Sequence, residues 1–117
     1  MIIFESTNIT SRGIGTLKKI PTKVFVNTTV STNGVINETH VRGKMNFEVN
    51  IVKIDQDEYD YLCDIFLLEN DFNIKDTDRG LEGRGYKLSG ETFSLTEIEN
   101  KKEKNFYYTG NFNVEKL

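Results

Sequence analysis

The chain has 117 residues, a formal net charge of −3 and a sequence pI of about 5.2. This length corresponds to one domain, and the acidic balance argues against specific nucleic-acid binding, which needs a basic face to displace counterions from phosphates. The single cysteine excludes an intrachain disulfide, and no apolar run reaches the roughly 20 residues of a membrane span. The first residues lack the positive leader of a signal peptide, so we expect a cytoplasmic protein that is neither secreted nor bound to a membrane.

Residues 1–22 form the least regular segment. Apolar side chains occur throughout it, but Gly13, Gly15 and Pro21 argue against one continuous strand. We therefore divide the chain into an N-terminal arm or edge segment, residues 1–22, and a single β-rich domain with one helix, residues 23–117. Two interpretations of the first segment remain open, because it can add an edge strand to its own sheet or pack on a neighbouring subunit.

Residues 24–42 are typical of a long β-hairpin. Apolar and polar residues alternate along the first strand, and Asn33-Gly34 favours a two-residue turn because both positions tolerate positive φ. The next strand is amphipathic, with one face made of Met45, Phe47, Val49 and Ile51. Val52 and Ile54 then reverse the alternation, which predicts a bulge or bend at this point.

One stretch changes from strand to helical periodicity. Asp55 is a suitable N-cap, and Glu58 three residues later completes a capping-box-like pair. Apolar residues then recur at helical spacing in two neighbouring rows, made of Tyr59, Leu62, Cys63 and Phe66 and of Tyr61, Ile65 and Leu68. The pattern predicts a helix over about 55–68, whose wide apolar arc packs against a sheet or a neighbouring subunit.

The remainder of the chain reads as short strands joined by turns. Strands are predicted near 72–74, 86–88, 92–98 and 105–114, with a turn at 76–80 and a glycine-rich loop at 80–85. The expected fold is mainly β, a β-sandwich or barrel of about seven strands with one α-helix packed on it.

The sequence offers little material for catalysis. His40 is the sole histidine and lies in the predicted hairpin, so a catalytic pair with Cys63 competes with a simple core thiol and a strand histidine. The glycine-rich loop precedes a predicted strand, whereas a phosphate-binding loop opens a helix. Acidic clusters at 55–60 and 76–82 leave cation binding open as an alternative to helix capping and turn formation. We therefore predict no enzyme activity, no cofactor and no catalytic or metal-binding residues.

The order of elements resembles that of small virion structural proteins of tailed bacteriophages, which include tail-tube, distal-tail and head–tail connector subunits. The resemblance rests on the irregular N-terminal segment, the hairpin, the amphipathic strand, the single helix, and the segment 89–100 followed by an aromatic-rich strand. It implies a non-enzymatic structural protein that forms homo-oligomeric rings, commonly hexamers. The implied partners are other copies and other virion proteins, and the implied location is the cytoplasm during assembly and then the virion.

We expect the N-terminal segment and the hairpin to make the contacts between subunits. Apolar groups on an arm and a projecting hairpin suit head-to-tail contacts, which close into rings when the rotation permits. The net acidic charge suits a ring lumen through which DNA passes. The candidate self-association residues are Ile2, Ile3, Phe4, Ile14, Leu17, Asn33 and Gly34. The alternative is a monomeric binding module for peptide or carbohydrate, with Tyr86, Tyr107 and Tyr108 in a groove.

Overall fold

The structure is a computed structural model that describes the backbone of residues 1–31 and 35–117 and the side chains of residues 1–23 and 42–117. Within these ranges the chain forms seven strands and one helix. Their bounds are β1 (Ile2–Glu5), β2 (Thr10–Ser31), β3 (Val35–Asp55), α1 (Gln56–Leu68), β4 (Phe72–Asp76), β5 (Leu81–Leu88), β6 (Thr96–Asn100) and β7 (Asn105–Lys116). The mainly β class with a single helix is therefore confirmed.

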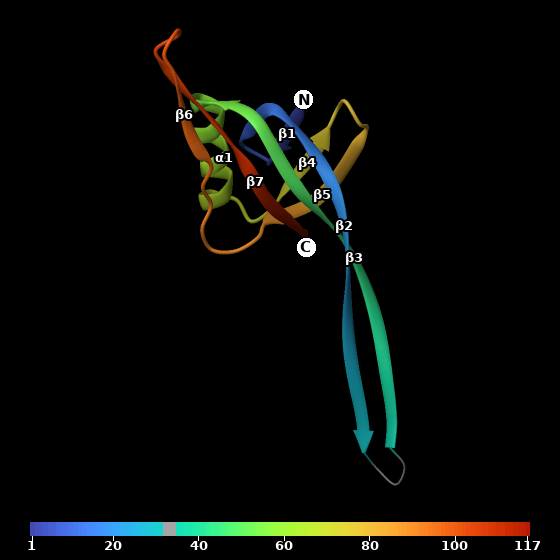
Figure 1. Cartoon of the computed structure of the whole chain (residues 1–117). Coiled ribbons are helices and arrows are strands. Elements are labelled where there is room, and N and C mark those ends of the chain that lie inside the picture. Colours follow the sequence, from blue (N-terminus) through green and yellow to red (C-terminus); the bar gives the residue numbers. More distant parts are fainter. Residues whose placement is uncertain (32–34) are drawn as a thin grey trace.

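Six of the strands close into an antiparallel barrel (Figure 1). Neighbouring strands follow the order β3-β2-β1-β4-β5-β7, and a further pairing of β3 with β7 joins the two ends. Among the described residues, β6 pairs with β7 alone and extends one side of the barrel. Closure gives each of the six strands a paired neighbour on both sides, although the edge of β2 that faces away from β3 has no strand beside it beyond Gly13 in the described part of the chain. Of the two predicted architectures, the barrel is the one observed.

Residues 1–22 are an integral part of this barrel. β1 lies between two strands, since Ile2 pairs with Gly13 of β2 and with Asp76 of β4. β2 then runs without a break through Pro21, at a level where β1 no longer lies beside it. A residue without an N–H is tolerated there because one edge of the strand is free. The predicted interruption of this strand is therefore wrong.

Gly15 also lies within the continuous strand β2, where β3 comes close to it. A Cβ atom at Gly15 would collide with the carbonyl oxygen of Asn50 on β3. The pairing of β2 with β3 shifts register between Ile14 and Gly15, and the pairing of β3 with β7 shifts between Ile51 and Ile54. The predicted bulge before the helix is thus confirmed, and Gly15 permits the close approach of the two strands beside it.

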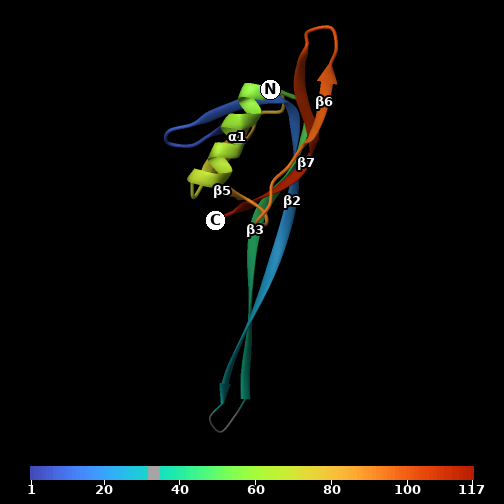
Figure 2. The same cartoon turned by 90° about the vertical axis from the view of Figure 1, so that its left-hand side faces the viewer.

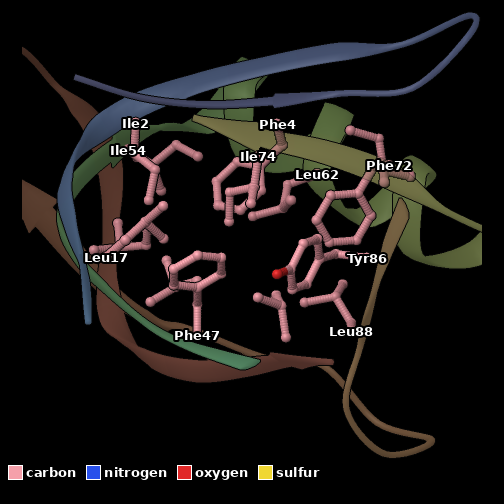
Figure 3. Packing of buried hydrophobic residues seen from close by; sticks show 14 residues of the cluster. Ile2, Phe4, Leu17, Phe47, Ile54, Leu62, Phe72, Ile74, Tyr86 and Leu88 are labelled. Carbon is pink, nitrogen blue, oxygen red and sulfur yellow. The ribbon is translucent and has the colours of Figure 1, made fainter. Parts of the chain in front are cut away.

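The barrel encloses the hydrophobic core (Figure 3). Residues from six strands and the helix contribute, and the fully or nearly fully buried members are Ile2, Phe4, Leu17, Phe47, Val49, Ile51, Ile54, Leu62, Ile65, Phe72, Ile74, Tyr86, Leu88 and Val114. Three of the four residues on the predicted face of the amphipathic strand are among them. Met45 is the exception and is exposed, because it lies where β3 leaves the barrel.

Helix α1 spans almost the predicted range, but its first turn differs from the prediction. Asp55 occupies the N-cap position with an extended backbone, and its side chain makes no capping hydrogen bond. The carboxylate of Glu58 accepts a hydrogen bond of 2.8 Å from the backbone N–H of Arg12 on β2 instead of closing a capping box. The hydroxyl of Ser11 donates to the carbonyl oxygen of Glu58 at 2.6 Å. The first turn is therefore tied to the barrel wall.

The glycine-rich segment is a strand and not the predicted loop. β5 includes Gly83, where an added Cβ would collide with the ring of Tyr86, and Gly85, whose φ is +69°. The pairing of β4 with β5 shifts register at this point, so the glycines allow a bulge in a strand that covers an aromatic ring. Farther along, β6 begins at Thr96 and not at the predicted residue 92.

Strands β2 and β3 continue far beyond the barrel as a two-stranded ribbon (Figures 1 and 2). Their pairing extends from the barrel to Ser31 opposite Val35, while the last contact of β3 with β7 is at Phe47. The portion from Ile20 to Ser31 is roughly 40 Å long at about 3.3 Å per residue. It accounts for the elongated shape, which measures 74 × 28 × 25 Å. The long hairpin is confirmed, and its predicted turn at Asn33-Gly34 lies outside the described residues.

Candidate interaction surface

The predicted self-association residues differ in how far the structure buries them. Ile2, Phe4 and Leu17 are fully buried in the core of their own barrel, which corrects the expectation that they contact a neighbouring subunit. They are buried because β1 closes the barrel between β2 and β4. Ile3 is half-buried, and Ile14 is 59% exposed. The remaining two candidates, residues 33 and 34, lie outside the described part of the chain.

Cys63 and His40 belong to different parts of the molecule. Cys63 lies half-buried on α1, where burial raises the pKa of its thiol above the usual value. The backbone of His40 pairs with Val26 on the projecting ribbon. The ribbon extends away from the helix in both views (Figures 1 and 2), so the fold does not bring the two residues together.

Two carboxylates of the acidic segment 76–82 make structural hydrogen bonds and an ion pair. The buried carboxylate of Asp76 accepts hydrogen bonds from the backbone N–H groups of Leu17, Asp78 and Arg79, at 3.1–3.2 Å. Asp78 forms an ion pair of 2.6 Å with the N-terminal ammonium group of Met1. In the described part of the chain, no three His, Cys, Asp or Glu side chains are grouped as a metal site requires. In the same part, no helix has the length and apolar character needed to cross a membrane.

The three tyrosines proposed for a binding groove do not share one surface. Tyr86 is buried against Phe47, and its hydroxyl donates to the carbonyl oxygen of Met45. Tyr107 and Tyr108 are consecutive on β7, so their side chains leave opposite faces of the strand. The ring of Tyr108 stacks on Tyr59 of the helix at 4.0 Å.

The base of the ribbon carries a cluster of exposed cations, which we call the basic root. It consists of Lys18, Lys19, Lys23, Arg42 and Lys44, all of which are exposed. The sequence contains no Asp or Glu between residues 6 and 37. The register places Lys18, Arg42 and Lys44 on one face of the ribbon with half-buried Ile20, and Lys19 and Lys23 on the other face with exposed Met45.

The outer side of α1 carries the opposite charge, and we call it the acidic helix face. Leu62 and Ile65 fix its orientation, because they are the buried residues of the helix. The face consists of the exposed residues Asp57, Asp60, Tyr61, Asp64, Leu67 and Leu68. Tyr61, Leu67 and Leu68 are 46%, 71% and 73% exposed. In the second predicted apolar row Ile65 packs on the barrel, whereas Tyr61 and Leu68 do not; the predicted packing of these two on a neighbouring subunit stays a prediction.

These two surfaces were not identified from the sequence, although a count of charges by segment would have indicated them. Residues 54–74 contain seven acidic residues and no lysine or arginine, whereas residues 6–37 contain four basic residues and no acidic one. The overall charge of −3 conceals this separation. The arrangement is suited to charge-complementary contact between molecules and offers no cluster suited to covalent chemistry among the described side chains. No family model, curated protein or solved structure matches the chain.

Proposed function

We propose that the protein is a non-enzymatic assembly subunit that binds other copies of itself through the β2–β3 ribbon and forms a ring. The proposed setting is the particle of a tailed bacteriophage or prophage, as a tail or head–tail connector component, in agreement with the order of elements in the sequence. Other virion proteins are its further proposed partners.

The observation that carries this proposal is the length of the ribbon relative to the barrel. From Ile20 to Ser31 the two strands pair only with each other among the described residues. An isolated two-stranded hairpin is marginally stable in water, because it has no third element on which to bury apolar side chains. Its sequence nevertheless contains strand-favouring residues at Val24, Phe25, Val26 and Val30. A neighbouring subunit would supply the missing surface.

The ribbon projects from one end of an elongated molecule, and in the proposed assembly it docks on the body of the next copy, so the receiving surface differs from the donating one. Such contacts are heterologous, and they form a closed ring when the rotation between neighbours divides a full turn. A ring of this kind accounts for the combination of a small barrel with a long projection.

Sedimentation velocity from about 1 to 100 μM tests the proposal. We expect the intact chain to form a discrete oligomer within this range. In a ribbon-shortened variant, residues 25–41 are replaced by Asn-Gly, so that Val24 and Arg42 keep their observed pairing across a two-residue turn. This variant is expected to keep the circular dichroism of the barrel and to sediment as a monomer.

The matched control is a full-length chain in which Thr28 and Thr29 are changed to serine, which keeps the ribbon length. An intact chain that is monomeric at 100 μM would refute the proposal. So would a folded ribbon-shortened variant that retains the oligomer of the intact chain.

A further inference from the structure

We infer that the acidic helix face of one copy is the surface that receives the basic root of the β2–β3 ribbon of the next copy. This inference rests on the proposed function, because it adds a second contact, at the base of the ribbon, to the contact that the ribbon beyond Val24 makes in the head-to-tail assembly. The occupant of the helix face is thus a second copy of this chain.

Charge complementarity is the first reason. The acidic helix face presents Asp57, Asp60 and Asp64 without a basic residue on the helix, and the basic root presents five exposed cations, of which Lys18 lies opposite the half-buried Glu48 of β3. In the part of the chain whose side chains are described, the ion pairs are Met1–Asp78 and Lys87–Glu115, and neither neutralises these two surfaces. Complementary patches of this kind steer association and select the partner.

The uncovered apolar side chains are the second reason. Leu67 and Leu68 are 71% and 73% exposed beside the carboxylates, and Tyr61 is 46% exposed on the same face. Apolar residues clustered within a polar rim mark protein interfaces. The face of the basic root that carries Arg42 and Lys44 offers the half-buried Ile20 as an apolar group, whereas Pro21 and Met45, which is 40% exposed, lie on the opposite face of the ribbon. A nucleic acid would satisfy the cations but would leave this helix face uncovered.

The positions of the two surfaces are the third reason. The ribbon leaves the barrel at one end of the long axis, and α1 packs on the barrel body (Figures 1 and 2). Each copy therefore offers a donor surface and a separate acceptor surface. A contact between unlike surfaces propagates from copy to copy, as a ring requires.

Charge reversal with rescue tests the inference. The helix-reversed variant carries Asp60→Lys and Asp64→Lys, and the ribbon-reversed variant carries Arg42→Glu and Lys44→Glu; all four positions are exposed. Each variant alone is expected to show at least about a tenfold higher dissociation constant for self-association, since reversal removes about two exposed ion pairs and adds repulsion. An equimolar mixture of the two variants should recover association within about threefold of the unchanged chain.

Two further variants distinguish the contribution of the helix face from an effect of net charge alone. Glu82→Lys with Glu99→Lys changes the net charge by the same amount at exposed strand positions away from the helix, and it should alter the dissociation constant less than twofold. Leu67→Ser with Leu68→Ser leaves the charge unchanged and should still weaken association several-fold. Circular dichroism of every variant checks that the barrel remains folded.

The outcomes distinguish this inference from the proposed function. An intact chain that forms oligomers, together with a helix-reversed variant of unchanged affinity, would overturn the inference and leave the assembly function standing. An intact chain that is monomeric at 100 μM would overturn both. Binding of a fluorescent 20-bp DNA duplex at 150 mM salt, lost in the ribbon-reversed variant while self-association is unchanged, would assign the basic root to nucleic acid and also overturn the inference.

Discussion

Replacement of the buried Asp76 is expected to be among the most destabilising single changes in the barrel. Its two carboxylate oxygens accept different hydrogen bonds. Oδ2 accepts from the N–H of Leu17, and Oδ1 accepts from the N–H groups of Asp78 and Arg79. The guanidinium of Arg79 in turn donates to the carbonyl oxygen of Leu17 at 3.0 Å. The side chain therefore fastens the β4–β5 turn to β2, where residue 17 belongs to the core.

The expected loss follows from these donors. Asp76→Ala leaves the buried N–H of Leu17 without an acceptor, which costs about 1–3 kcal/mol, and removes two further bonds in the turn that water replaces in part. We expect a loss of about 3 kcal/mol in the free energy of unfolding, which corresponds to a decrease of roughly 12 °C in melting temperature for a chain of this length. The free energy of unfolding of Asp76→Asn should lie between those of the unchanged chain and Asp76→Ala, because the amide retains one acceptor oxygen but turns an NH₂ group towards the other donors.

Urea unfolding and thermal melts followed by circular dichroism measure this loss, at one fixed protein concentration because self-association would shift the transition. The control is Asp78→Ala, which removes only the exposed ion pair with the N-terminus and should cost less than about 1 kcal/mol. A melting temperature for Asp76→Ala within about 3 °C of the unchanged chain would refute the reasoning. It would mean that the Leu17 N–H finds another acceptor without cost.

Three further predictions concern the helix and the pairing of β2 with β3. Leu62→Ala should cost about 2–5 kcal/mol in urea unfolding because the side chain is fully buried, whereas Asp55→Ala should cost less than about 0.5 kcal/mol because its side chain makes no cap bond; equal losses would contradict this ranking. A thiol reagent should label Cys63 slowly in the native protein, because burial raises the pKa of the thiol and only the thiolate reacts. The labelling rate should keep increasing with pH beyond the pH at which a free thiol is fully ionised. Fast labelling at pH 7 would count against the burial of this thiol. Gly15→Ala should lower the melting temperature by several degrees through collision with the Asn50 carbonyl, and Gly43→Ala, where an added Cβ meets open space, serves as its control.

The sequence by itself determined the elements whose signal is local. Helix α1 was predicted to within a residue at its start, because apolar residues at helical spacing from Tyr59 to Phe66 are a property of neighbouring positions. The amphipathic strand and the bulge at Val52 could also be predicted, since alternation and its reversal are visible within a few residues. The same is true of the long hairpin.

The tertiary structure alone decided features that depend on distant residues. Whether Ile2 and Phe4 are core or arm depends on β1 pairing with β4, some seventy positions away. Strand β2 tolerates Gly15 because β3 comes close to it there, and Pro21 because the strand edge beside it is free. No local sequence pattern shows either neighbour. The mixed face of α1, with carboxylates beside exposed leucines, likewise follows from which side the barrel covers. Periodicity predicts that an apolar arc exists, and only the packed fold determines how much of that arc is left for a partner.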